Sequence, residues 1–182
     1  MAIQELVSLI SPPDRPLETG TQDKWETLQK DLSIRLPSDY FEFGMVYGSG
    51  YFEDERSGQL RIYQPFWSKF RETLDWSVAN LSASREYEGE EYVPFPIFPE
   101  IPGLFIWASD VHGNDFFWHT EGEPDEWQIV VGGRDGEWDK HDGPMTSFLA
   151  RAFTRQIDVH VWPEPFFADP SKIVFTPTKE YS

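Results

Sequence analysis

The sequence contains no cysteine. Without thiols the chain forms no disulfide and offers no thiolate for catalysis or for zinc. It also lacks a long apolar run, since no stretch approaches the roughly 20 residues that span a bilayer. The N-terminal segment has no positively charged start, and Gln4 and Glu5 interrupt its apolar residues, which makes it a poor signal peptide. We therefore expect a cytoplasmic protein that does not enter membranes.

Basic residues are scarce. Fifteen Lys and Arg stand against 32 Asp and Glu, which gives a formal net charge of −17 at pH 7. Nucleic-acid affinity depends largely on Lys and Arg that displace counterions from phosphates, so the composition argues against direct DNA or RNA binding. The same charge would attract a basic partner and speed its encounter, although acidity can also serve solubility alone.

Aromatic residues are abundant and supply material for a core. They make up 16% of the 182 residues, including eight Trp and fifteen Phe. Each buried ring removes a large area from water, so a wholly disordered chain is excluded. The length and the absence of an obvious repeat predict one domain over residues 1–182.

Three helices are predicted before residue 48, each with one apolar face. The first is a short docking helix within residues 1–11, the second is capped by Thr21, and the third starts at Leu36-Pro37-Ser38-Asp39. Their inward-facing residues are predicted to be Ile3, Leu6, Val7 and Ile10; Trp25, Leu28 and Leu32; and Tyr40, Phe43 and Tyr47. Glycines at 48 and 50 should end the third helix.

Strands dominate the remainder. Residues 51–54 and 59–63 are predicted to form a hairpin, and residues 104–108, 116–120 and 127–131 an antiparallel meander. Between them, apolar residues from Trp67 to Leu81 recur at helical spacing, and a last helix covers 145–155. Residues 156–182 form a C-terminal extended arm, either packed on the body or held by a partner. The predicted class is α+β, a largely antiparallel sheet with helices packed around it.

Several blocks in this order resemble a known family. They are Trp25 in an early helix, Leu36-Pro37-Ser38-Asp39-Tyr40 with Phe43, and Tyr47-Gly48-Ser49-Gly50, followed by Phe105-Ile106-Trp107-Ala108-Ser109-Asp110, Gly113-Asn114-Asp115-Phe116-Phe117 and Ser147-Phe148-Leu149. Residues 21–155 thereby resemble the SUKH superfamily, the Smi/Knr-type domain. Gly44 and the glycine turn at 47–50 depart from the family pattern, and residues 156–182 have no counterpart in it.

The resemblance implies a function as well as a fold. Bacterial members are commonly immunity proteins that bind a toxin, often a nuclease, whereas fungal members regulate cell-wall synthesis through protein contacts. No catalytic residue set is established for the family. We therefore expect a non-catalytic protein-binding domain without a cofactor, whose partner is a toxin domain, plausibly basic. A regulator or scaffold of cell-wall synthesis is the first alternative.

Three parts of the sequence contain residues that could bind a metal ion. The first group contains Asp110, His112 and His119, and the second contains Asp139, His141 and Asp142. Neither group carries a metal-binding helix motif. Residues 135–146 imitate the start of a calcium loop, yet Lys140 takes the glycine position and Thr146 replaces the final acid. The sequence therefore predicts no metal site.

Three enzymatic interpretations each have a structural alternative. Ser49 lies between glycines but lacks the strand-to-helix setting of a nucleophile elbow, so these glycines are interpreted as a helix stop. Gly132-Gly133 is interpreted as a hairpin rather than a phosphate loop. A glycosidase using paired carboxylates remains a second alternative, because acids and Trp are plentiful, but 32 acids also pair by chance.

The candidate partner-binding residues come from two loops. Tyr51, Glu53, Asp54 and Glu55 follow the glycine turn, and Asp110, Asn114 and Asp115 lie in the central hairpin loop. An aromatic ring can anchor an interface and carboxylates can steer a basic partner toward it. For each acid, a solvated loop residue without a partner is the competing interpretation.

Overall fold

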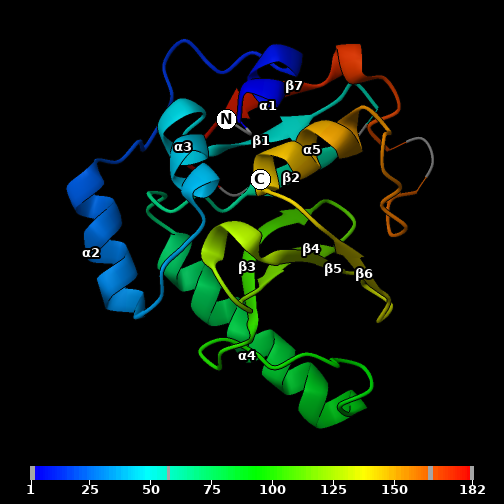
Figure 1. The fold of residues 1–182 in the computed structure, drawn as a ribbon. Helices are drawn as coiled ribbons and strands as arrows, with labels where there is room; N and C mark the ends of the chain where they lie inside the picture. The colour runs from blue at the N-terminus through cyan, green and yellow to red at the C-terminus, as the bar shows by residue number, and fades with distance from the viewer. Residues whose placement is uncertain (1–2, 57, 164–165, 181–182) are drawn as a thin grey trace.

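The computed structural model describes residues 3–56, 58–163 and 166–180, and within them one seven-stranded sheet forms the centre of the protein (Figure 1). Every pair of neighbouring strands is antiparallel, in the order β6-β5-β4-β3-β2-β1-β7. The strands are β1 Gly50–Glu53, β2 Gln59–Ile62, β3 Leu104–Asp110, β4 Asp115–His119, β5 Gln128–Gly132, β6 Trp138–His141 and β7 Val174–Pro177.

Helices cover this sheet, which confirms the predicted α+β class. They are α1 Ile3–Leu9, α2 Gln22–Leu32, α3 Ser38–Val46, α4 Phe70–Glu88 and α5 Met145–Phe153, with 3-10 turns η1 Pro124–Glu126 and η2 Pro170–Lys172. Thr21 caps α2 as predicted, because its hydroxyl accepts the Lys24 N–H at 3.3 Å. Gly48 has a φ of 68° just after α3, which explains why that helix ends there.

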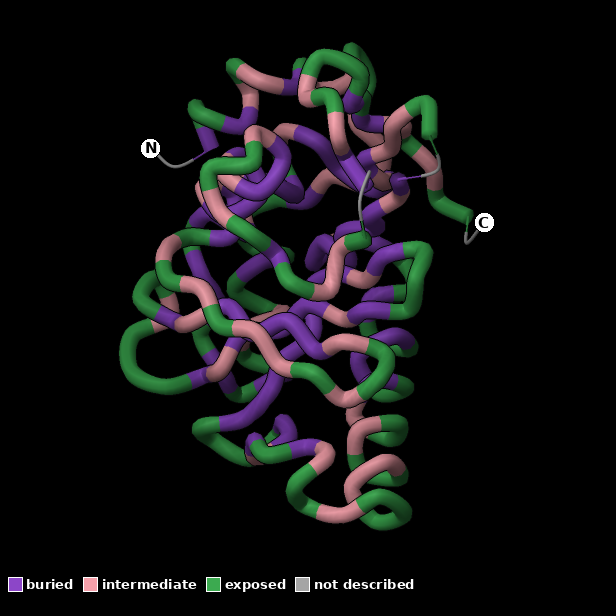
Figure 2. Tube along the Cα trace, turned by 90° about the vertical axis from the view of Figure 1, so that its right-hand side faces the viewer, coloured by how far each residue is buried: buried purple, intermediate pink, exposed green. Residues whose placement is uncertain are grey.

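One face of the sheet is buried beneath α1, α3 and α5. Phe52 of β1 points into this layer, with ring centroids 5.0 Å from Phe153 and 5.1 Å from Phe175. Phe43 and Tyr47 of the third predicted helix stack 4.9 Å apart and are fully buried there. Figure 2 shows this buried layer passing through the middle of the molecule. The aromatic richness of the sequence is therefore concentrated in one continuous core.

The opposite face carries α4, which starts later than predicted. Trp67 precedes the helix and stacks on Tyr63 at 5.7 Å, so its placement on the helical stripe was wrong. Phe70 and Leu74 are buried, but Trp76 is 54% exposed and Tyr87 is 88% exposed. The α4 layer is therefore less completely buried than the layer of α1, α3 and α5.

Within the described residues, no helix combines the length and apolarity needed to cross a membrane.

The C-terminal arm packs on the body. β7 pairs with β1 in antiparallel register, with Phe175 opposite Phe52, so the arm adds an edge strand to the sheet. Before it, the ring of Trp162 lies nearly parallel to that of Phe153, with 6.3 Å between centroids. From the sequence, the aromatic residues of the arm fit either a core or a partner; in the structure they pack on the body.

Candidate protein-binding surface

The seven candidate contact residues belong to two segments that the sheet brings to one end. β2 pairs with β3, so Leu60 lies opposite Asp110, and the Val111 N–H donates to the Gln59 carbonyl at 3.0 Å. The turn from β1 to β2 and the loop from β3 to β4 are therefore neighbours. The two groups of predicted residues can face the same partner, which the sequence alone did not establish.

Asp110 and Asn114 lie inside this end of the sheet and brace it. Both are buried, and Asp110 Oδ1 accepts the N–H groups of His112 and Asn114 at 2.9 and 3.0 Å. Its Oδ2 accepts from Asn114 Nδ2 at 2.8 Å and from Trp162 Nε1 at 3.1 Å. Burial raises the pKa of Asp110, while these hydrogen bonds oppose the rise. The two side chains hold the loop and the arm together, so their part in partner contact would be indirect.

The acids of the β1–β2 turn are nearer to solvent. Asp54 Oδ1 accepts the backbone N–H groups of Arg56 and Gly58 at 2.9 and 2.8 Å, which closes the turn. Glu55 is exposed and pairs with Lys172 Nζ at 3.2 Å. The Glu53 carboxylate accepts from the Thr176 hydroxyl across the β1–β7 pair. Exposed ion pairs contribute little to stability, so Glu55 is available to a partner at small cost.

Tyr51 and Asp115 share the sheet face that α4 partly covers. A single cross-strand row contains Thr176, Tyr51, Arg61, Ser109, Asp115, Gly132 and Trp138. Residues directly opposite on antiparallel strands point to the same side. The Arg61 guanidinium lies 5.3 Å from the Tyr51 ring centroid, and two strands separate Tyr51 from Asp115, about 14 Å at the usual strand spacing.

A groove of about 280 Å³ opens between α4 and the strands beside Asp115. Trp76 and Asn80 of α4 line one side, and Asp115 of β4 and Trp138 of β6 line the other. Burial, and secondarily the neighbouring Asp110 carboxyl, raise the pKa of Asp115 to about 7. Trp76, Asn80 and Trp138 were missed as site residues, because only the folded chain brings them to Asp115.

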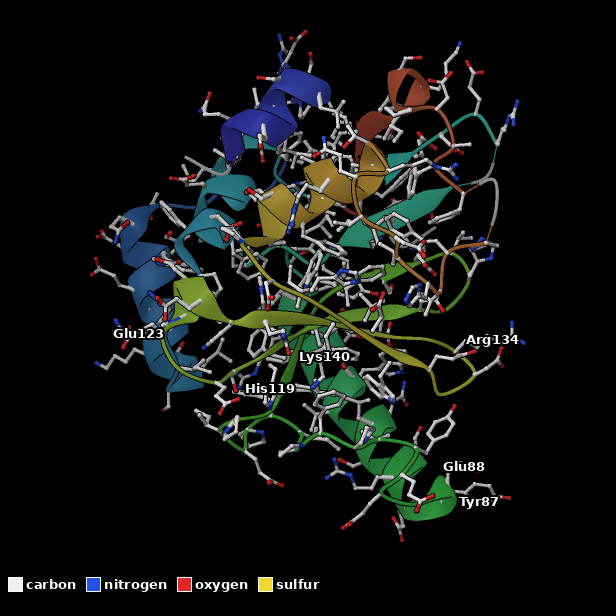
Figure 3. The ribbon with its side chains drawn as sticks, turned by 45° about the vertical axis from the view of Figure 1, so that its right-hand side comes forward. Tyr87, Glu88, His119, Glu123, Arg134 and Lys140 are labelled. Carbon is white, nitrogen blue, oxygen red and sulfur yellow. The ribbon has the colours of Figure 1, made fainter. Side chains whose placement is uncertain are left out.

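Neither histidine group considered for metal binding forms a set of three ligands among the described residues, although His141 Nε2 lies 2.8 Å from Asp139 Oδ2. Asp110 lies at one end of the β3–β4 hairpin, whereas His119 is opposite Leu104 at the other end. Burial lowers the pKa of His119, and the nearby Lys140 lowers it further against the effect of Glu121. Figure 3 shows His119 and Lys140 lying near each other, away from the turn that carries Arg134. In the described part of the chain, no group of three His, Asp or Glu side chains is placed to hold a metal ion.

The glycine turn and Gly44 have packing explanations. Ser49 is buried and accepts a hydrogen bond from Gln64 Nε2 at 2.7 Å, so its hydroxyl is a structural acceptor. A Cβ at Gly44 would lie 3.0 Å from Gln64 Oε1 and 3.1 Å from a Phe66 ring atom. The departure from the family pattern at Gly44 therefore makes room for Gln64 and Phe66 against α3.

These features define an α+β domain whose antiparallel sheet has one aromatic, helix-covered face and one partly open face. A model of the SUKH family, described as "SMI1-KNR4 cell-wall", matches residues 22–154. The chain therefore belongs to the SUKH family, as the sequence blocks predicted. No curated protein shows significant similarity to the chain.

Proposed function

We propose that this chain is a non-catalytic protein-binding domain, an immunity protein that neutralises a cognate toxin by direct binding in the cytoplasm. Membership of the SUKH family over residues 22–154 is the observation that carries the proposal. The formal charge of −17 favours a basic partner, whose approach it would accelerate. A nuclease domain, which must itself bind phosphates, is the kind of toxin that fits this charge.

Binding would use the end of the sheet where the two loops meet. Tyr51 supplies an aromatic anchor, and Glu53, Asp54, Glu55 and Asp115 supply carboxylates near solvent. Carboxylates at the rim of an interface mainly increase the association rate, whereas a packed aromatic residue lowers the dissociation rate. Asp110 and Asn114 would hold the loop in the shape that the partner meets.

A regulator or scaffold of cell-wall synthesis is the second candidate. The observation that favours it is the description of the matching family, which names the cell wall. Such a protein would recover cytosolic enzymes of envelope synthesis in a pull-down, and a toxin gene beside its own would not be expected.

The glycosidase interpretation has less support. That chemistry needs two carboxylates that face each other across an open cleft. Asp110, the acidic neighbour of Asp115, uses both oxygens to accept hydrogen bonds from its own loop and from Trp162. A carboxylate held in this way is poorly placed to activate water or to attack a sugar.

The test is a co-expression experiment with the toxin encoded beside the gene. Co-expression should restore growth of cells that carry the toxin, and the two purified proteins should form a complex. The association rate should fall steeply between about 50 and about 500 mM salt, because screening weakens steering between opposite charges. Absence of a complex, together with release of sugar from a polysaccharide panel, would support the glycosidase instead.

A further inference from the structure

The groove beside Asp115 has the size of one side chain. Its volume of about 280 Å³ lies below the ~300–1,000 Å³ that is usual for pockets holding small-molecule ligands. Trp138 forms a fixed wall, because its indole N–H donates to the Tyr92 carbonyl at 2.8 Å. Tyr92 is held in turn by its hydroxyl, which donates to the Arg134 carbonyl at 3.1 Å. Two of the aromatic rings that line the groove are therefore held by hydrogen bonds.

Asp115 differs from the buried carboxylates Asp39 and Asp110. Asp39 accepts from the Thr146 N–H and hydroxyl at 2.8 and 3.0 Å, and Asp110 accepts four hydrogen bonds. Among the described residues, nothing donates to the Asp115 side chain or forms an ion pair with it. Asp115 is half-buried in the wall of the groove, so its carboxylate can be reached by a cationic group that enters there.

The charges around Asp115 indicate the sign of that partner. Asp110 on β3 is the acidic neighbour, and α4 contributes Trp76, Asn80 and Ser84, which carry no charge. Arg134 lines the rim from the β5–β6 turn, but its side chain extends outward at the margin of the molecule and forms no ion pair with Asp115 among the described residues (Figure 3). Arg134 balances the formal charge of the groove from its rim, but Asp115 has no ion pair among the described residues and would accept a cation.

We infer that this groove receives one arginine or lysine side chain of the protein partner, with Asp115 as its counter-ion and Trp76 and Trp138 as flanking rings. The inference rests on the proposed function and names a contact within it. A guanidinium or ammonium group gains from an aromatic face as well as from a carboxylate. A bare metal ion would need several oxygen or nitrogen ligands, and the groove offers one carboxylate.

The test is an NMR titration of the whole protein with N-acetyl-arginine methylamide. N-acetyl-citrulline methylamide, which has nearly the same shape without the charge, is the matched ligand. The arginine compound should shift the backbone amides of residues 113–116 and 132–138 and the indole signals of Trp76 and Trp138, with a dissociation constant on the order of 1–10 mM. The citrulline compound should leave these signals in place.

Two variants with the same change of charge separate a specific contact from general attraction. Asp115→Asn should abolish the shifts, whereas Asp135→Asn should retain them, because Asp135 is exposed in the adjacent turn and does not line the groove. Arginine affinity should also fall about tenfold from pH 8 to pH 6, because protonation of a group with a pKa of about 7 removes the counter-ion.

Equal shifts from both ligands, shifts that survive Asp115→Asn, or no saturable shift up to about 50 mM would overturn the inference. These outcomes are independent of the toxin experiment. A protein that neutralises its toxin without using the groove would retain the proposed function, and Asp115→Asn would then leave affinity for the toxin unchanged. If the groove binds arginine but no toxin partner is found, the proposed function is wrong and the binding site is still supported.

Discussion

The two faces of the sheet differ in how completely their side chains are satisfied. Beneath α1, α3 and α5, Phe52 and its neighbours are fully buried and packed ring against ring. On the α4 side, Asp115 is half-buried without a hydrogen-bond partner among the described residues, and Trp76 is half exposed beside it. A half-buried carboxylate without a partner adds little to stability, which agrees with the role inferred for Asp115 as a counter-ion in the groove.

The strongest test of this contrast compares two consecutive residues on opposite faces. Phe52→Ala should lower the free energy of unfolding by about 3–5 kcal/mol, because it leaves a cavity in the aromatic core. Tyr51→Ala should cost under about 1 kcal/mol, since the ring lies on the partly open face against Arg61. Urea denaturation measures both, and similar losses for the two variants would contradict the distinction.

A second test concerns the two neighbouring carboxylates. Asp110→Ala should lower the free energy of unfolding by about 2–3 kcal/mol, because buried donors in the loop and in Trp162 lose their acceptor. It should also increase hydrogen exchange of the 111–114 amides. Asp115→Ala removes the same group from the same end of the sheet and should not destabilise the protein at neutral pH. A comparable loss from Asp115→Ala would show that Asp115 has a stabilising partner.

The pH dependence of stability tests whether the ionised Asp115 carboxylate destabilises the folded protein. Its pKa is raised from 3.8 to about 7, so the folded state holds this proton more tightly and the native protein loses stability as pH rises from about 4 to 7. Asp115→Asn should therefore stabilise the protein at pH 8 by roughly 1–2 kcal/mol, less than the ~4 kcal/mol of the full pKa change, because the side chain still meets solvent.

Denaturation curves at pH 4.5 and pH 8 measure this effect. The advantage of Asp115→Asn over the native protein should shrink at the lower pH, where the native carboxyl is largely protonated in the folded state. Asp135→Asn makes the same change of charge on the exposed turn and is the control in both measurements. An equal advantage of Asp115→Asn at both pH values would mean that the ionised carboxylate is not the source of the instability.

The smallest effect on stability is expected at Trp76. Because 54% of this residue is exposed, Trp76→Ala should change the free energy of unfolding by no more than about 0.5 kcal/mol. The same variant should weaken arginine binding in the groove by about fivefold, the size of a solvent-accessible cation–π contact. Thermal melts and the NMR titration measure the two quantities. A large loss of stability would place Trp76 in the core.

Local patterns predicted the helices and most strands well. The apolar spacing of residues 3–10, the cap at Thr21 and the glycine after α3 each depend on neighbours along the chain, and each is confirmed. The prediction that Trp67 lies on the apolar stripe of α4 was wrong. Trp67 has the spacing of that stripe, but it lies in the turn before the helix, where it stacks on Tyr63. The hairpin at Gly132-Gly133 is confirmed, although the bounds of its second strand, β6, were not predicted.

The candidate site was less accessible from sequence, because its geometry depends on strand register. Asp110 and Asp115 are both acids of one short loop, and nothing in the sequence distinguishes them. The strand register and the C-terminal arm distinguish these two acids. Trp162 of the arm, 52 positions away in sequence, donates a hydrogen bond to Asp110. Asp115 lies opposite Gly132, which has no side chain to contact it. Contact of Tyr51, Glu53, Asp54, Glu55 and Asp115 with a partner remains a prediction for the binding experiments.

The junction between β1 and β7 has a consequence for the order in which the chain folds. Strands β3 to β6 are successive hairpins, so each can form by closing a short loop, whereas the Thr176–Glu53 contact joins positions 123 apart. Closing such a long loop costs more entropy and slows the step that requires it. In pulsed hydrogen exchange during refolding, β4 and β5 should become protected before β7, which would attach last to a nearly finished sheet.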